Sequence, residues 1–180
     1  MRYIALIAAV ALIVLAAGCT TPSAPQTGTP TPAATVTTVG TTGPAVSIAA
    51  GVARIANVGG NATVPIILAQ APNGISGYNV TVVLSDPSVG EIAAVAFPDW
   101  AGMKSASTVP AGMVALQAVD MSMKVPVGAT NVTLATLTVT GRAAGTAAIT
   151  VRPDPVLGVQ DRSGDLYTVT VSPGSLTVGA

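Results

Sequence analysis

The chain has 180 residues, of which 50% are hydrophobic and only 8% are charged, and seven basic and seven acidic side chains give a formal net charge of zero. This balance excludes a general electrostatic attraction to nucleic acid or to an anionic membrane surface. The absence of histidine removes the side chain most often used for proton transfer near neutral pH, and a single cysteine excludes an internal disulfide.

The first segment, residues 1–18, carries Arg2 and then an apolar run from Ile4 to Ala17. This run has about 14 residues, whereas a helix that crosses a bilayer needs about 20. We therefore predict that residues 1–18 form a secretory signal peptide and that the protein is exported.

The five residues from Leu15 to Cys19, LAAGC, directly follow the apolar run and resemble the lipobox of prokaryotic lipoproteins. In that family a peptidase cuts before the cysteine, which becomes the lipid-modified N-terminus. The resemblance implies lipidation of Cys19 and a place on the outer face of the cell membrane, where a lipid anchor with two acyl chains is enough for stable attachment. Ordinary signal cleavage nearby, or an uncleaved anchor, is the alternative.

Residues 19–44 combine this cysteine with a segment that has ten threonines, five prolines and no charge. Such a composition cannot bury enough apolar surface to offset its ordering entropy, so we predict an extended linker. A fully extended linker of this length would reach roughly 75 Å. Dense threonine with proline also resembles O-glycosylated stalks, and a plain linker is the alternative.

Residues 45–180 contain short segments rich in Val, Ile and Thr, each bounded by Gly, Pro, Asn or Asp, and no window with helical spacing, a cap and a stop. About nine strands are expected, over residues 45–49, 61–69, 77–85, 89–97, 112–119, 131–140, 145–151, 166–171 and 175–178. The fold class that this spacing predicts is all-β, an antiparallel β-sandwich with jelly-roll or Greek-key connections.

Alternation within two strands predicts finer detail. Tyr78, Val80, Val82 and Leu84 share one face, so Asn79 and its alternate neighbours share the other. In residues 131–140 the apolar positions cannot all lie on one face without a break near residues 135 and 136, where we expect a β-bulge or a twist.

Seven short motifs occur in the order in which cohesin domains carry them. They are GNATVPI (60–66), GISGY (74–78), DPSV (86–89), LATLT (134–138), GTAAI (145–149), DRSG (161–164) and GSLTV (174–178). The domain thus resembles a cohesin of the cohesin and carbohydrate-binding-module superfamily. This resemblance implies a non-catalytic module that binds a protein partner, in the cellulosomal members a calcium-loaded dockerin held on one sheet face. No residue is carried over as a dockerin contact, because several aromatic strand positions of the family are aliphatic here.

The alternative function on the same fold is a carbohydrate-binding or purely structural domain of the cell envelope. An enzyme is not expected, and no catalytic residue is assigned. The sequence offers no histidine, no free thiol once Cys19 is lipidated and no glycine-rich phosphate loop. Glu91 and Asp99 have no supporting residues that would make them a glycosidase pair.

Candidate contact residues for a partner are few. Trp100 follows Pro98 and Asp99 in an expected loop, where an exposed indole stacks on a sugar or anchors a protein interface; plugging the end of the sandwich is the alternative. Asn79 and Thr81 are further candidates, because they share the strand face opposite Tyr78. Four methionines, at positions 103, 113, 121 and 123, suit either an adaptable binding surface or the core.

The remaining candidates concern metal and glycan. Asp161 and Asp165 lie around Gly164 and offer oxygen ligands that suit calcium, but they lack the alternate-residue spacing of an EF-hand. We therefore predict a hairpin turn and no cofactor, with a structural calcium ion as the weaker alternative. Asn61, Asn79 and Asn131 each begin an Asn-x-Thr sequon, and such sites are N-glycosylated in some exported proteins.

Overall fold

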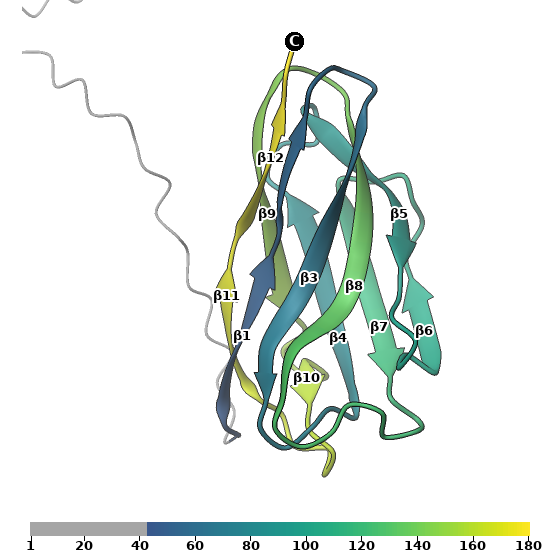
Figure 1. Ribbon diagram of the computed structural model, residues 1–180, viewed down its shortest axis with the longest axis vertical. Helices are drawn as coiled ribbons and strands as arrows, with labels where there is room; N and C mark the ends of the chain where they lie inside the picture. Colours follow the sequence, from purple (N-terminus) through teal and green to yellow (C-terminus); the bar gives the residue numbers. More distant parts are fainter. Residues whose placement is uncertain (1–42) are drawn as a thin grey trace, which may run out of the picture. The chain divides into compact units, whose positions relative to one another are not determined.

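The computed structural model describes residues 43–180 (Figure 1). The predicted signal peptide, the lipidation site Cys19 and all but the last two residues of the predicted linker lie outside this range. The described residues contain no helix long and apolar enough to cross a membrane.

Twelve strands make up the described fold. They are β1 (Ala45–Ala50), β2 (Val52–Ile55), β3 (Asn61–Ala71), β4 (Gly77–Leu84), β5 (Gly90–Ala96), β6 (Met103–Ala106), β7 (Met113–Val119), β8 (Ala129–Gly141), β9 (Gly145–Pro153), β10 (Val159–Gln160), β11 (Thr168–Ser172) and β12 (Gly174–Val178). The predicted all-β class is confirmed.

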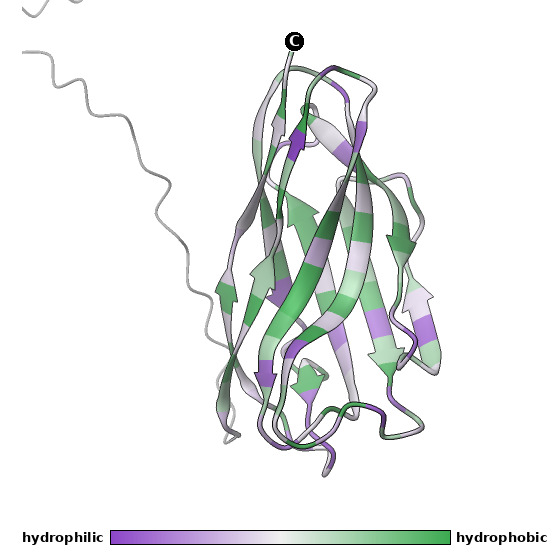
Figure 2. Ribbon diagram, in the orientation of Figure 1, coloured by the Kyte–Doolittle hydropathy of each residue, from purple (hydrophilic) through white to green (hydrophobic). Residues whose placement is uncertain are grey.

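Two sheets pack face to face. The small sheet has five strands in the order β11-β1-β3-β8-β5, and the large sheet has seven, in the order β2-β12-β9-β4-β7-β6 with β10 beside β4. Figure 1 shows the strands of both sheets running along the long axis of the sandwich. Figure 2 shows hydrophobic bands alternating with paler ones along β3, β4 and β8, as expected for strands with one buried face.

The strand count is higher than the nine expected. Every expected strand is present, and the three additional ones are short: β2 and β6 have four residues each and β10 has two. β2 was not expected as a separate strand because only Gly51 separates it from β1. All four residues of β6 are exposed, so its sequence shows no alternation of buried and exposed residues.

The sandwich is also not wholly antiparallel. β1 runs parallel to β11 in the small sheet, and β2 runs parallel to β12 in the large sheet. At Gly51, between β1 and β2, and at Pro173, between β11 and β12, a single residue takes the chain from the small to the large sheet. These two crossings place the first and last strands of the domain side by side.

The core between the sheets follows the predicted alternation. Tyr78, Val80, Val82 and Leu84 are all buried, as predicted. The predicted bulge in β8 is confirmed close to its expected place, because Ile66 pairs with Ala135 whereas Ile67 pairs with Thr133. Leu134 is therefore the extra residue, and the bulge buries both Leu134 and Ala135.

Candidate functional site: the outer face of the large sheet

The widest regular surface lies on the side of the large sheet that faces away from the core. We call it the outer face and define it by the outward residues of β9, β4, β7 and β6. They are Ala148, Thr150 and Arg152 on β9; Asn79, Thr81 and Val83 on β4; Met113, Ala115, Gln117 and Val119 on β7; and Met103 and Ser105 on β6.

Strict alternation in β7 produces the centre of this face. Along β7 exposed and buried residues alternate without a break, so Ala115 and Gln117 point to solvent while Leu116 between them is fully buried. Cross-strand pairing then aligns the outward side chains in rows. Gln117 lies between Asn79 on β4 and Ser105 on β6.

The adjoining row carries the only charged side chain of the outer face. Thr81 pairs with Ala115 on one side and with Arg152 on the other. Arg152 is exposed, and it takes part in neither the one ion pair nor any of the side-chain hydrogen bonds found within residues 43–180. A guanidinium on this otherwise uncharged surface offers five N–H donors in a fork that fits a carboxylate.

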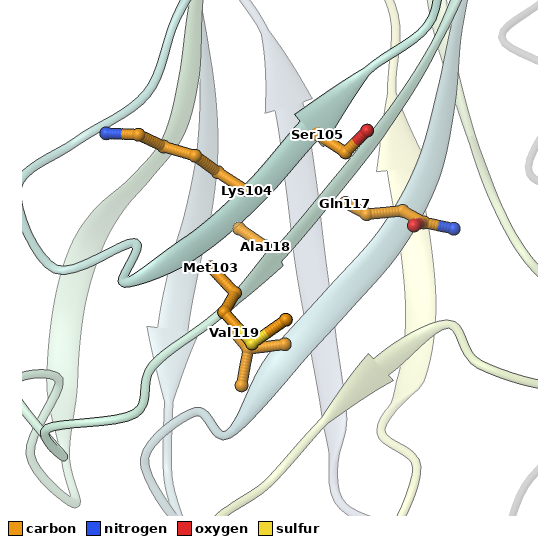
Figure 3. Close-up of a pocket in the computed structure, with 6 residues that line it drawn as sticks. All are labelled: Met103, Lys104, Ser105, Gln117, Ala118 and Val119. Carbon is orange, nitrogen blue, oxygen red and sulfur yellow. The ribbon is translucent and has the colours of Figure 1, made fainter.

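A shallow depression of about 140 Å³ lies across β6 and β7 (Figure 3). Its lining includes Met103, Val119, Ser105 and Gln117. In Figure 3 the Met103 and Val119 side chains lie together, whereas Lys104 points to the opposite side of the strand. Pockets for cofactors and drug-sized ligands usually measure about 300–1,000 Å³. This depression therefore suits a side chain of a partner better than a cofactor.

Trp100 lies apart from the outer face, against the core. Its indole N–H donates a 3.0 Å hydrogen bond to the carbonyl oxygen of Thr133, and its ring meets Tyr78 edge-on with 5.9 Å between centroids. Tyr78 in turn donates to the carbonyl oxygen of Leu134, and burial raises the pKa of Tyr78. Trp100 thus packs against the core, as in the alternative in which it plugs the end of the sandwich. Its use as a contact for a partner stays a prediction.

Asp161 is a buried turn residue. Its carboxylate accepts hydrogen bonds from the backbone N–H groups of Ser163 and Asp165, at 2.8 and 3.0 Å, and from the side-chain amide of Asn73 at 3.1 Å. These donors account for its burial, since a buried carboxylate needs such partners. Asp165 is exposed, and within residues 43–180 no three His, Cys, Asp or Glu side chains gather as metal ligands.

The three sequons differ in their setting. Asn61 and Asn131 are exposed at the starts of β3 and β8, and the side-chain oxygen of Asn61 accepts a 2.6 Å hydrogen bond from Thr140. Asn79 is partly buried within the outer face, beside Gln117. Glycosylation of these residues stays a prediction, and a glycan on Asn79 would stand where a partner of the outer face would sit.

The sequence-based search identified Asn79 and Thr81 but missed most of the outer face. Ala115 and Gln117 were recoverable from alternation in residues 112–119, and Arg152 from a lone charge in the apolar segment AAITVRP. Core filling by the four methionines at positions 103, 113, 121 and 123 is wrong, because each is between 59% and 69% exposed.

We compared the chain with protein-family models, curated proteins and solved structures. No protein-family model matches the sequence, and no curated protein matches it. Among solved structures, the cohesin CaCohA2 from Clostridium acetobutylicum has 21% identity and a TM-score of 0.61, covering 76% of this chain and 92% of its own. A non-cellulosomal cohesin from the hyperthermophilic archaeon Archaeoglobus fulgidus has 18% identity and a TM-score of 0.56, covering 75% of this chain and 91% of its own.

The domain has the cohesin fold. The cohesin-like sandwich expected from the sequence motifs is thereby confirmed. A third structure of this fold, a type I cohesin from Clostridium thermocellum, was solved in complex with a dockerin; it has 16% identity and a TM-score of 0.60, and covers 74% of this chain and 99% of its own. CaCohA2 has also been solved in complex with a dockerin.

Proposed function

We propose that this protein is a non-catalytic, exported lipoprotein whose cohesin-like domain binds another protein through the outer face of the large sheet. The most specific candidate partner is a protein that carries a dockerin module. The single observation that carries the proposal is the outer face itself, a surface with exposed apolar side chains and one unpaired arginine. Solved cohesins of the same fold in complex with dockerins support the choice of partner.

The composition of the outer face favours a protein over other ligands. Protein interfaces are depleted of charge at their centre and enriched in methionine and arginine. Met103, Met113 and Arg152 meet this description, and amide groups of Asn79 and Gln117 supply donors and acceptors between them. Adaptable methionine side chains further suit a surface that packs against a partner.

A carbohydrate ligand is the second candidate on this fold, and the aromatic residues argue against it. Stacking on a sugar ring requires an exposed aromatic face. Among residues 43–180, Tyr78 and Tyr167 are buried, and Phe97 and Trp100 are partly buried against the core. None of them belongs to the outer face. A purely structural envelope domain would bind nothing, so a capture experiment separates it from the proposal.

Capture from an extract of the source organism tests the proposed function. The chain from Thr20 onward is immobilised, extract is applied with calcium, and bound material is eluted with a chelator and identified by mass spectrometry. Because dockerins are calcium-loaded modules, we expect a dockerin-bearing protein in the chelator eluate. Retention of polysaccharide alone, or of nothing, contradicts the proposal.

The lipid anchor has its own test. We expect the full-length protein to sediment with membranes and Cys19→Ser to be released into the soluble fraction, because the thioether-linked lipid then cannot form. Membrane fractionation followed by immunoblotting measures the difference. Continued membrane retention of the serine variant contradicts lipidation at Cys19 and leaves the capture result unaffected.

A further inference from the structure

Exposed apolar side chains gather at one end of the sandwich. We call it the entry end, because β1 begins there and the preceding 44 residues join the domain at this point. Register places the end of β7 at the same end, since Val119 pairs with Gly77, the first residue of β4. Two loops near the entry end carry large exposed apolar residues: Met121, Met123 and Val127 in the loop that follows β7, and Val156 and Leu157 in a loop that leaves β9 beside Asn79.

In the first loop, residues 120–128, several backbone polar groups have hydrogen-bond partners within the protein. The buried carboxylate of Asp120 accepts hydrogen bonds from the N–H groups of Lys124 and Val125, at 3.0 and 2.7 Å. The guanidinium of Arg162 donates to the carbonyl oxygens of Met123 and Val125, at 2.7 and 2.9 Å. Polar backbone groups that already have partners lower the cost of removing this loop from water.

These contacts also fix the direction of the exposed methionines. Met123 adopts a φ of 51°, in the left-handed region that a side chain of this kind rarely occupies. Hydrogen bonds to the Asp120 carboxylate and from the Arg162 guanidinium fix the backbone around Met123, while the Met123 side chain is 69% exposed. These hydrogen bonds hold the loop in a conformation that presents its apolar side chains to solvent. Without them, the unfavourable backbone conformation of Met123 would not be maintained.

The second loop, residues 154–158, is built in the same way. One carboxylate oxygen of Asp154 accepts hydrogen bonds from the N–H groups of Val156 and Leu157, each at 2.8 Å, and the Asp154 carbonyl accepts from Gly158 at 2.9 Å. Val156 is 72% exposed at the tip. Both loops thus expose apolar side chains while several of their backbone N–H groups are hydrogen-bonded to an aspartate carboxylate of the same loop.

We propose that the entry end docks on a lipid bilayer through these two loops. Loop tips that expose apolar side chains and keep their backbone groups paired are suited to the hydrocarbon boundary, where unpaired backbone groups are costly. This inference rests on the proposed lipidation of Cys19, because the segment that would lead to the lipid joins the domain at Ala45, at the same end as the first loop. The outer face extends from these loops along the strands, so its centre around Thr81 and Ala115 remains free for a protein.

Charge plays no part in this docking. The formal net charge of the chain is zero, and the cations Lys124 and Arg162 are matched by the carboxylates of Asp120 and Asp154 in the two loops, so no excess positive charge attracts an anionic surface. Binding by apolar insertion is therefore expected to be the same for neutral and anionic bilayers. This expectation separates a membrane contact of this kind from electrostatic adsorption.

Vesicle flotation tests the proposal. The chain from Thr20 onward, which lacks Cys19 and cannot carry a lipid, is mixed with vesicles of phosphatidylcholine, with or without phosphatidylglycerol. We expect it to float with both kinds of vesicle to the same extent. Met121→Ser/Met123→Ser is expected to reduce the partition constant by about 100-fold, roughly tenfold for each side chain removed.

Val52→Ser/Val58→Ser is the matched control, because these two exposed valines lie outside both loops. It should float as the unsubstituted chain does, and thermal unfolding checks that both variants fold. The proposal is overturned if the unsubstituted chain does not float, if the methionine variant floats equally well, or if flotation requires phosphatidylglycerol and is lost in salt. Protein capture by the outer face is measured without vesicles, so either result can fail alone.

Discussion

Replacing Ala115 by arginine is expected to weaken binding of the captured protein partner by at least about 100-fold. Ala115 lies in the middle of the outer face, where Thr81 separates it from Arg152. A guanidinium here would stand above the surface that the partner must cover, and burying its charge beside Arg152 without an opposite charge costs several kcal/mol. Titration calorimetry with the purified partner measures the change in Kd.

Ala94→Arg provides the matched control for this prediction. Ala94 is an exposed alanine on β5, at the outer side of the small sheet, and it pairs with Thr138. Both variants add the same side chain to an exposed strand position, so both should keep the melting temperature of the unsubstituted domain. If Ala115→Arg binds as tightly as Ala94→Arg, the partner does not use the outer face.

Replacing Gly174 by alanine is expected to destabilise the domain by about 3 kcal/mol or more, a large effect for one methyl group. Gly174 opens β12 at the point where the chain crosses to the large sheet. A Cβ atom there would overlap the carbonyl oxygen of Gly51 and lie 2.7 Å from that of Ala50. Both obstacles are backbone atoms, so no side-chain rotation relieves the clash and the paired strands must separate.

Thermal unfolding followed by circular dichroism measures this effect. A loss of about 3 kcal/mol corresponds to a melting temperature roughly 10 °C lower for a domain of this size. Ser175→Ala is the control, because Ser175 follows in the same strand with its side chain on the outward side of the sheet, where it is partly exposed. Equal melting temperatures for the two variants would show that the first and last strands do not pack as closely as described.

Most of the fold could be predicted because the strands are amphipathic. Period-two alternation in residues 77–84 marks the buried face of β4, and its failure in β8 marks the bulge at Leu134. Alternation carries no information about strand direction, so the parallel pairs β1 with β11 and β2 with β12 could not be foreseen. Each joins segments more than 100 residues apart, and no local pattern specifies such a pairing.

The candidate site could be predicted only in part, for a similar reason. Asn79 and Thr81 follow from the alternation of β4 alone. Their assembly with Gln117 and Arg152 depends on β4 lying between β7 and β9, a property of sheet order. The burial of Asp161 was equally beyond reach, because its hydrogen bond from Asn73 forms only when two loops distant in sequence meet.

The position of β1 also determines how the domain responds to mechanical load. β1 lies inside the small sheet, bonded to β11 on one side and to β3 on the other. A pull along the preceding chain acts parallel to this strand, so the hydrogen bonds of both ladders share the force at once and cannot be unzipped one after another. A module tethered by its N-terminus and held by a partner on its sheet would therefore resist extension by shear between strands.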